Sequence, residues 1–205
     1  GRHAEVSFTD DWIEDAKRRD FTMNTLLADV SGNVYDPLAQ GIKDAKAGRV
    51  VFVGEASRRI EEDYLRILRY FRFHAFYGQG EMEVGALQAC AQAAGKISSL
   101  SRERITSEFL KILSVSNPAD VLEIMFENNI LSVLFDKTYD ESMLVKLCRI
   151  QAQFEALDLM SRLFVVMGCK PKFHDDLLRL THAQKNFLVK LDMAYSPVWY
   201  LSEKA

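Results

Sequence analysis

The chain has 205 residues and a formal net charge of −3, with 48% hydrophobic and 27% charged residues. This length allows one large domain or two small ones, and the composition is ordinary for a globular protein. The slightly acidic balance excludes a chain-wide attraction to nucleic acid. Any RNA binding must therefore depend on local basic surface.

The cysteines and the apolar runs restrict the compartment. Cys90, Cys148 and Cys169 are odd in number, widely spaced and without a C-x-x-C pair. This argues against a disulfide framework and a zinc site, and it is typical of a reducing compartment. The longest apolar runs, such as residues 163–169, are far too short to span a bilayer, and the N-terminus has no signal pattern. We expect a cytoplasmic protein with no membrane partner, whose oligomeric state the sequence does not determine.

The first 53 residues mix helical and extended patterns. Residues 1–8 alternate like a strand but have no earlier partner, so we expect the chain to begin inside a domain. Capping residues, acidic first turns, turn formers and β-branched runs predict the elements that follow. These are a helix from Trp12 to about Ala28, a hairpin over 29–35 that turns at 31–33, a short helix over 41–46 and a brief strand over 50–53.

From Glu55 onward the periodicity predicts helices alone, so we expect an α+β chain that is mostly α. Ser101 and Asn117, the latter followed by Pro118, are suitable helix starts. The second half is predicted to be a helical bundle or superhelix. Its expected helices cover residues 55–77, 83–96, 101–115, 118–128, 130–135, 140–154, 157–168, 171–180 and 181–195.

The helix expected over residues 55–77 carries two different faces. No Gly or Pro interrupts it, and at 100° per residue its apolar side chains gather on one side, which should pack on a core. These apolar residues are Ile67, Leu68, Phe71 and Ala75. The opposite side carries Asp63, Arg66, Arg69 and Arg72.

Two interpretations of that charged face are open. The simpler one is a solvated face with a local Asp63–Arg66 ion pair at i,i+3. Three arginines at this spacing, however, repel one another unless something anionic lies over them, and phosphate suits the guanidinium fork. The second interpretation is therefore a phosphate-binding face.

Asp63 and Arg66 suggest a sharper hypothesis. A carboxylate accepts hydrogen bonds and a guanidinium donates them, so the pair complements an exocyclic amine beside a ring-nitrogen acceptor. Cytosine and adenine both present that edge, whereas uracil and guanine present a carbonyl and a ring N–H. A bidentate match is worth about 1–3 kcal/mol of discrimination per base. The pair could select C and A without a nucleic-acid template.

Four short segments follow one another along the first 111 residues. Residues 19–24 read R-D-F-T-M-N, 36–44 read D-P-L-A-Q-G-I-K-D, 62–73 read E-D-Y-L-R-I-L-R-Y-F-R-F and 101–111 read S-R-E-R-I-T-S-E-F-L-K. In order and spacing they resemble the R-D-x-x-x-N, D-P-x-x-x-G-x-x-D, E-D-x-L-R-x-L-R-x-x-R-F and S-x-E-R-I-x-x-E-x-x-K elements of class II tRNA nucleotidyltransferases and the related bacterial poly(A) polymerases. One match alone would be weak, but the four together are specific.

This resemblance implies an architecture. Residues 1–53 would be the C-terminal portion of the nucleotidyltransferase head, a remnant of its palm. Residues 54–115 would form a helical neck that contains the base-reading helix. Residues 116–205 would form the body and the start of the tail, in contact with tRNA through its shape and phosphates.

The resemblance also implies roles for the first two segments. Arg19, Asp20 and Asn24 would contact the triphosphate and sugar of the incoming nucleotide; the alternative is a salt-bridge cluster at a helix N-terminus. Residues 36–49 would be a flexible hinge between head and neck, with a plain turn as the alternative.

The third and fourth segments would supply the rest of the site. Asp63 and Arg66 would read the base, and Arg69 and Arg72 would support the triphosphate or the base pocket. Residues expected mainly to brace the neck are Glu103, Arg104 and Glu108.

One departure from the family pattern concerns the metal. In the family, two aspartates in a D-x-D pair hold two Mg²⁺ ions for phosphoryl transfer, after a Gly-Gly turn upstream of R-D-x-x-x-N. This sequence contains no D-x-D. We therefore expect a fragment that is inactive alone, with no catalytic or metal-binding residue of its own and with Mg²⁺ bound by an upstream segment.

The resemblance thus implies template-independent addition of CCA to tRNA 3′ ends from CTP and ATP, with this chain selecting the nucleotide and binding RNA. The motifs do not separate this from poly(A) addition from ATP alone, or from partial CC or A addition. An alternative of another class is a helical RNA-binding protein without catalysis.

Overall fold

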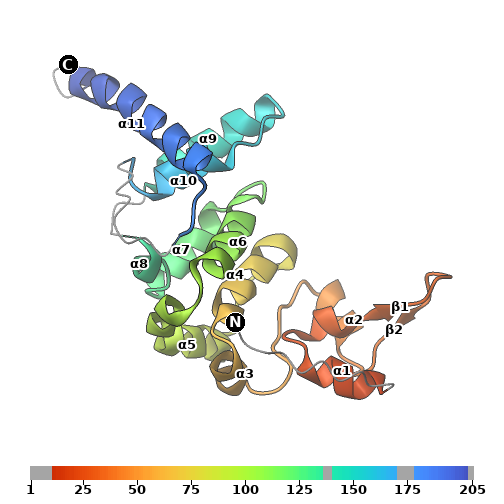
Figure 1. The fold of residues 1–205 in the computed structure, drawn as a ribbon. Coiled ribbons are helices and arrows are strands. Elements are labelled where there is room, and N and C mark those ends of the chain that lie inside the picture. Colours follow the sequence, from red (N-terminus) through yellow and green to blue (C-terminus); the bar gives the residue numbers. More distant parts are fainter. Residues whose placement is uncertain (1–10, 136–139, 170–177, 203–205) are drawn as a thin grey trace.

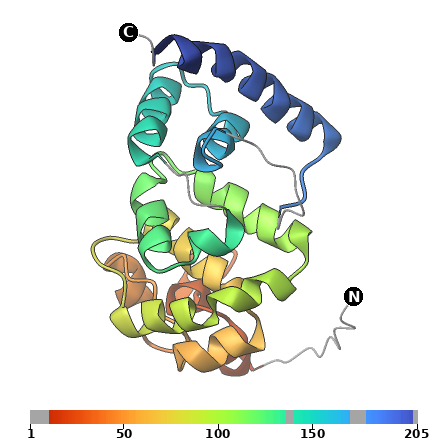
Figure 2. The same ribbon diagram turned by 90° about the vertical axis from the view of Figure 1, so that its left-hand side faces the viewer.

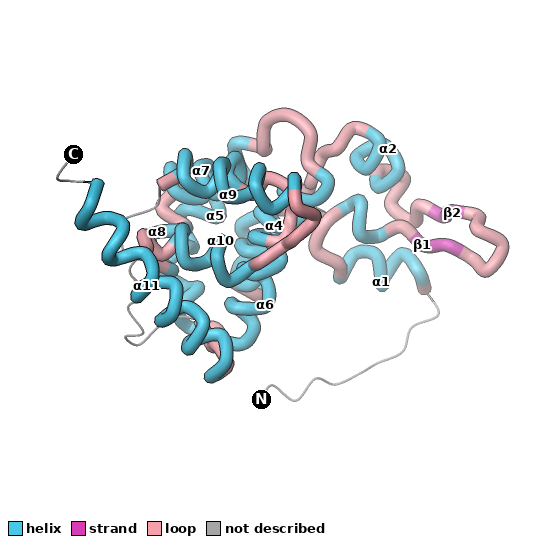
Figure 3. The backbone as a smooth tube through the Cα atoms, turned by 90° about the horizontal axis from the view of Figure 1, so that it is seen from above, coloured by secondary structure: helices cyan, strands magenta, loops and turns pink. Residues whose placement is uncertain are grey.

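The computed structural model of the chain describes residues 11–135, 140–169 and 178–202. The strand expected over residues 1–8 and most of the helix expected over 171–180 lie outside these ranges. Within them, helices dominate and two short strands form one antiparallel pair, which confirms the predicted α+β, mostly α class. A small mixed unit lies at one end of the molecule and the last helix at the other (Figures 1 and 3).

The small unit begins with a helix that is shorter than predicted. Its elements are α1 (Trp12–Arg18), the 3-10 helix η1 (Thr22–Thr25), β1 (Leu27–Ala28), β2 (Val34–Tyr35) and α2 (Gly41–Lys46). The helix predicted to Ala28 is wrong beyond Arg18. Asp20 accepts the N–H of its neighbour Phe21 at 3.0 Å, and its main-chain oxygen accepts the Val53 N–H at 2.9 Å. Both bonds hold the backbone away from the helical path.

The remaining elements of this unit match the sequence more closely. The hairpin pairs Leu27 with Tyr35 around a turn whose Gly32 has φ +83°, and α2 has its predicted bounds. The strand expected over residues 50–53 reduces to one bridge between Phe21 and Phe52, which are both buried. Its hydrogen bonds go to the segment that follows α1.

The long predicted helix is two helices, α3 (Ala56–Glu62) and α4 (Leu65–Tyr77). Asp63 interrupts it with an extended backbone (φ −156°, ψ 105°), and its Oδ1 accepts the Leu65 N–H at 3.2 Å. The prediction of continuity is therefore wrong, although that of the apolar side is confirmed, since Ile67, Leu68 and Phe71 are fully buried.

The other helices follow the predicted positions. The segment expected over 83–96 divides into an α-helix and a 3-10 helix, and Asp140 caps α9 by accepting the Met143 N–H at 3.0 Å. The structure extends the last helix beyond the predicted end. The elements are α5 (Val84–Ala93), η2 (Ala94–Ser99), α6 (Arg102–Leu113), α7 (Ala119–Glu127), α8 (Leu131–Leu134), α9 (Glu141–Gln153), α10 (Leu159–Val166) and α11 (His182–Ser202).

One apolar core runs from the small unit into the helical part. Helix α4 packs against α3, α6 and α7, and α10 packs against α6, α9 and α11, so the helices succeed one another along the molecule (Figure 2). All three cysteines are buried free thiols. In the described ranges, no helix is both long and apolar enough to cross a membrane.

Candidate functional site

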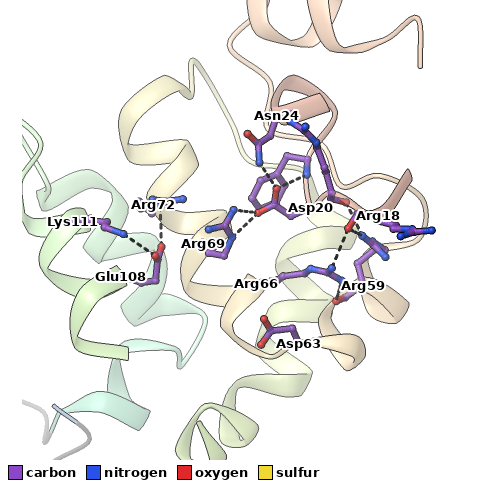
Figure 4. Close-up of polar contacts among 12 residues, drawn as sticks. Arg18, Asp20, Asn24, Arg59, Asp63, Arg66, Arg69, Arg72, Glu108 and Lys111 are labelled. Carbon is purple, nitrogen blue, oxygen red and sulfur yellow. Dashed lines mark hydrogen bonds and ion pairs between the residues drawn. The ribbon is translucent and has the colours of Figure 1, made fainter. Parts of the chain in front are cut away.

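Asp20 lies where the end of α1 meets α4, and it is only 5% exposed. Its Oδ2 accepts a hydrogen bond from Arg69 Nε at 2.6 Å and lies 2.5 Å from Arg69 Nη2 as an ion pair, while its Oδ1 accepts Asn24 Nδ2 at 2.8 Å. The structure therefore brings together Asp20, Asn24 and Arg69, from two of the predicted motifs (Figure 4). Arg19 and Asp20 do take part in ion pairs, with Asp15 and Arg69, but they follow the C-terminal end of α1, so the alternative of a cluster at an α-helix N-terminus is wrong in its position.

Arg19 faces back along α1. Its guanidinium pairs with Asp15 at 2.8 Å and donates to the main-chain oxygen of Asn24 at 2.8 Å. These bonds fix the loop that carries Asp20 and Asn24, and leave the Arg19 side chain one-third exposed.

Arg66 pairs with Glu62, not with Asp63. Its Nη1 donates to Glu62 Oε2 at 2.5 Å and to the main-chain oxygen of Arg59 at 2.6 Å. The prediction of a local Asp63–Arg66 ion pair is therefore wrong. The hydrogen bond from Arg66 is the largest cause that holds the pKa of Glu62 below its ordinary value; burial opposes it, and the hydrogen bond from Arg59 lowers the pKa further.

Asp63 finds its partner on a different helix. Arg104 Nη2, on α6, lies 2.6 Å from Asp63 Oδ2. Partial burial by itself would raise the pKa of Asp63, but the hydrogen bonds from Arg104 and the Leu65 N–H outweigh it and leave the pKa below its ordinary value. A carboxylate offers about four acceptor positions, so Asp63 retains room for a further donor.

Arg72 faces α6 as well. Its Nε lies 2.9 Å from Glu108 Oε2, as an ion pair without the alignment of a hydrogen bond, and Lys111 contacts the other Glu108 oxygen at 3.1 Å. The guanidinium carbon lies 4.9 Å from the centroid of the Phe73 ring. Glu108 thus links α4 and α6 through its ion pair with Arg72.

The repulsion argument needs correction, because each of the three arginines has a carboxylate partner within the protein. The pairs are Arg66 with Glu62, Arg69 with Asp20, and Arg72 with Glu108. No external anion is therefore required to hold this face together. Its arginine side chains still keep 15–28% of their surface exposed.

The predicted hinge is tied to the small unit by Asp44, which is 2% exposed. Its carboxylate accepts Thr22 Oγ1 and Arg49 Nη2, each at 2.7 Å. The proposed flexibility of residues 36–49 stays a prediction, as does the division into head, neck and body.

Two residues at this junction were missed by the sequence reasoning, Arg59 and Glu62. Arg59 Nη2 donates to the main-chain oxygens of Arg18 at 2.7 Å and Arg19 at 2.6 Å, and its Nη1 pairs with Glu62. The spacing of 59, 62 and 66 was the available signal, since i,i+3 and i,i+4 pairs of opposite charge attract.

The described residues contain no cluster of three or more His, Cys, Asp or Glu side chains that could hold a metal ion. The carboxylates of the candidate site, Asp20 and Asp63, are each bonded to a guanidinium.

Two family models match the chain. One, described as the poly A polymerase head domain, covers residues 1–51, and the other, described as a probable RNA and SrmB-binding site of polymerase A, covers residues 81–141. The chain belongs to the family of poly(A) polymerases and CCA-adding enzymes. All four motifs lie within or between the two matched regions.

Curated relatives carry CCA-adding names. A mitochondrial CCA tRNA nucleotidyltransferase 1 of Danio rerio is 46% identical over 129 residues, which cover 62% of this chain and 30% of that protein. A CCA-adding enzyme of Leuconostoc mesenteroides is 35% identical over 133 residues, which cover 65% and 33%. The chain thus spans about a third of the length of these relatives.

Solved structures of this family have the same fold. The Bacillus stearothermophilus CCA-adding enzyme in complex with CTP superposes with a TM-score of 0.63 at 29% identity, covering 80% of this chain and 42% of that one. The Thermotoga maritima enzyme complexed with tRNA superposes with a TM-score of 0.69 at 24% identity, covering 94% and 51%. The second likeness shows the fold alone.

Proposed function

We propose that this chain takes part in template-independent addition of CCA to tRNA 3′ ends, by selecting CTP and ATP and by binding RNA. The observation that carries the proposal is the position of Asp63 and Arg66. Both lie at the α3–α4 break, beside the Asp20–Arg69 pair that the family pattern assigns to the nucleotide. Their side chains are 27% and 15% exposed, so a ligand can reach them.

The proposed recognition uses complementary hydrogen bonds. Asp63 would accept the exocyclic amine of cytosine or adenine, and Arg66 would donate to the adjacent ring nitrogen. Uracil and guanine would place a carbonyl against the Asp63 carboxylate. The pair would therefore reject them electrostatically.

The phosphate side would use the arginines beside the base. Arg69 and Arg72 each hold a carboxylate that a triphosphate could replace, because a guanidinium binds phosphate oxygens by the same fork. Arg19, Asp20 and Asn24 would contact the triphosphate and sugar from the loop after α1. In the family pattern Mg²⁺ belongs to a D-x-D segment, so we propose that this chain alone does not transfer nucleotides.

Poly(A) addition from ATP is the second candidate function. The first family model bears a poly A polymerase name, and the edge read by Asp63 and Arg66 is shared by adenine and cytosine. The relatives' names favour CCA addition. We propose the cytoplasm as the compartment from the cysteine pattern, with the mitochondrion, named for the vertebrate relatives, as the alternative.

Equilibrium binding of CTP, ATP, UTP and GTP to the chain tests the proposal. We expect preference for CTP and ATP, lost in both Asp63→Ala and Arg66→Ala. Asp29→Ala, in the hairpin turn, is the control and should keep the preference. Equal affinity for all four nucleotides, or a preference unchanged in both site variants, would contradict the assignment.

A further inference from the structure

Arg59 contacts both sides of the candidate site, the end of α1 and Arg66. The family pattern described for this sequence assigns it no role. Its side chain is only 12% exposed. Its guanidinium donates to the main-chain oxygens of Arg18 and Arg19 at 2.7 and 2.6 Å, and its own main-chain oxygen accepts Arg66 Nη1 at 2.6 Å. One residue thus contacts the end of α1 and the predicted base-reading arginine.

The contact with α1 fixes the residues that follow it. The last carbonyls of a helix lack intrahelical partners and carry partial negative charge, so a cation there is doubly favourable. The Arg59 guanidinium satisfies two of these carbonyls directly before Asp20. The position of Asp20 and Asn24 relative to α3 therefore depends on the Arg59 fork.

The contact with Arg66 fixes the side of the site that is proposed to read the base. Arg59 Nη1 and Arg66 Nη1 both bond to Glu62 Oε2, so one carboxylate oxygen holds two guanidiniums. Arg66 Nη1 therefore has two acceptors, the main-chain oxygen of Arg59 and the carboxylate of Glu62, and together they restrain its position. Figure 4 shows Arg59 between Arg18 and Arg66.

Arg69 also joins the two parts, through Asp20, but it is itself a predicted ligand of the nucleotide. Arg59 differs because its Nη1 and Nη2 donate to protein atoms, Glu62 and the main-chain oxygens of Arg18 and Arg19, and its Nε is buried without a hydrogen-bond partner among the described residues. Its substitution can change the spacing of the site without removing a ligand contact.

We propose that Arg59 is a positioning residue, which sets the distance between the phosphate-side residues after α1 and the base-reading Arg66. The inference rests on the proposed function, because it assumes that both sides bind one nucleotide. It predicts that a ligand with both a base and a triphosphate is sensitive to Arg59. A ligand with phosphates alone needs only one side and is insensitive.

The experiment compares CTP with inorganic tripolyphosphate on the 205-residue chain and its variants. Arg59→Ala should weaken CTP binding by about tenfold or more, as expected when a site loses its preset geometry, and change tripolyphosphate binding less than about twofold. Arg59→Lys should fall between, because an ammonium lacks the fork that bonds to the two carbonyls through Nη2 and to Glu62 through Nη1 at once. Arg58→Ala is the matched control, since Arg58 lies on the same helix with 81% exposure and should leave both ligands unchanged.

Equal weakening of CTP and tripolyphosphate in Arg59→Ala would overturn the positioning role, because Arg59 would then act on the phosphates or on folding. Unchanged CTP binding would overturn it as well. Arg59→Lys guards against an Ala variant that fails to fold.

A second readout separates this inference from the proposed function. The NMR signals of Arg69 Nε–H and the Asn24 side-chain amide report the two bonds to Asp20 without any nucleotide. If the unaltered chain binds no CTP, the proposed function fails in this chain, and the inference stands or falls on these signals. They should shift and exchange faster in Arg59→Ala but not in Arg58→Ala; unchanged signals would overturn the inference.

Discussion

The junction between α1 and α4 and the helices around α10 both use arginines that are largely out of solvent, but only those at the junction pair with carboxylates. At the junction the arginines keep 12–28% exposure and each pairs with a carboxylate, although Arg59 and Arg66 also donate to main-chain oxygens. In the body, Arg162 is 3% exposed, and its described partners are uncharged. They are Gln151 Oε1 at 2.7 Å and the main-chain oxygens of Leu113 and Val115 at 2.7 and 2.5 Å.

This difference separates two uses of one side chain. A guanidinium enclosed by neutral carbonyls binds the ends and turns of helices together, and no ligand can replace those partners. A guanidinium that holds a carboxylate at a partly exposed rim can exchange it for another anion, such as phosphate. Arginines of the first kind should govern stability, and those of the second kind should govern ligand binding.

The largest effect on stability is expected from Arg162→Leu. The change leaves three buried acceptors without donors, so the free energy of unfolding should fall by about 3 kcal/mol. Urea denaturation measures it, with Arg149→Leu at an exposed position of α9 as the control. A loss below about 1 kcal/mol would mean that Arg162 does not hold these elements together.

The core and most helices were accessible from the sequence, and the partners of the charged residues were not. Periodicity located the apolar side of α4 and the helices after it, and the Ser31-Gly32-Asn33 turn located the hairpin. The break at Asp63 has no Gly or Pro to mark it, because it depends on a side chain that bonds to Leu65 and to Arg104, 41 residues away.

The end of α1 was missed for a similar reason. Local composition favours continuation, whereas Asp20 pairs with Arg69, 49 residues away, and the backbone around it pairs with residues 51–53. The family motifs still selected the residues that meet at the junction. The i,i+4 spacing of Glu62 and Arg66 was a signal for their pair, but no spacing could show that Asp63 bonds to Arg104 on another helix.

A smaller effect is expected from Glu108→Gln, which removes the charge that pairs with Arg72. Arg72 has a carboxylate partner, as at the junction, but that partner is nearly as buried as Arg162. Glu108 is 5% exposed and holds both Arg72 and Lys111, so loss of its charge leaves a guanidinium with little solvent. The free energy of unfolding should fall by about 2 kcal/mol. Glu103→Gln, whose partner Arg179 is exposed, is the control on the same helix and should cost less than about 0.5 kcal/mol. Equal losses would remove the distinction between buried and exposed pairs.

The smallest expected effect is a shift in acid sensitivity. The folded-state pKa of Asp63 lies below its ordinary value, so Asp63 contributes stability that is present above that value and is lost as pH falls through the lowered pKa. Arg104→Gln removes the hydrogen bond and should raise this pKa towards its ordinary value, so that Asp63 contributes less stability and its loss is complete at higher pH. The cost at neutral pH should stay below about 1 kcal/mol, because the pair is partly exposed.

Carboxyl ¹³C NMR titration measures the Asp63 pKa in both forms. Arg102→Gln, at a neighbouring exposed position, should leave it unchanged. If the pKa of Asp63 is the same with and without Arg104, the ion pair is not formed in solution.

A crystal structure of the chain with bound CTP would test the central claim most directly. The account predicts that the cytosine amine donates to Asp63, that Arg66 donates to the ring nitrogen beside it, and that phosphate oxygens contact Arg69 or Arg72. A structure with the cytosine bound elsewhere, and with Asp63 bonded only to Arg104 and Leu65 as now, would contradict it.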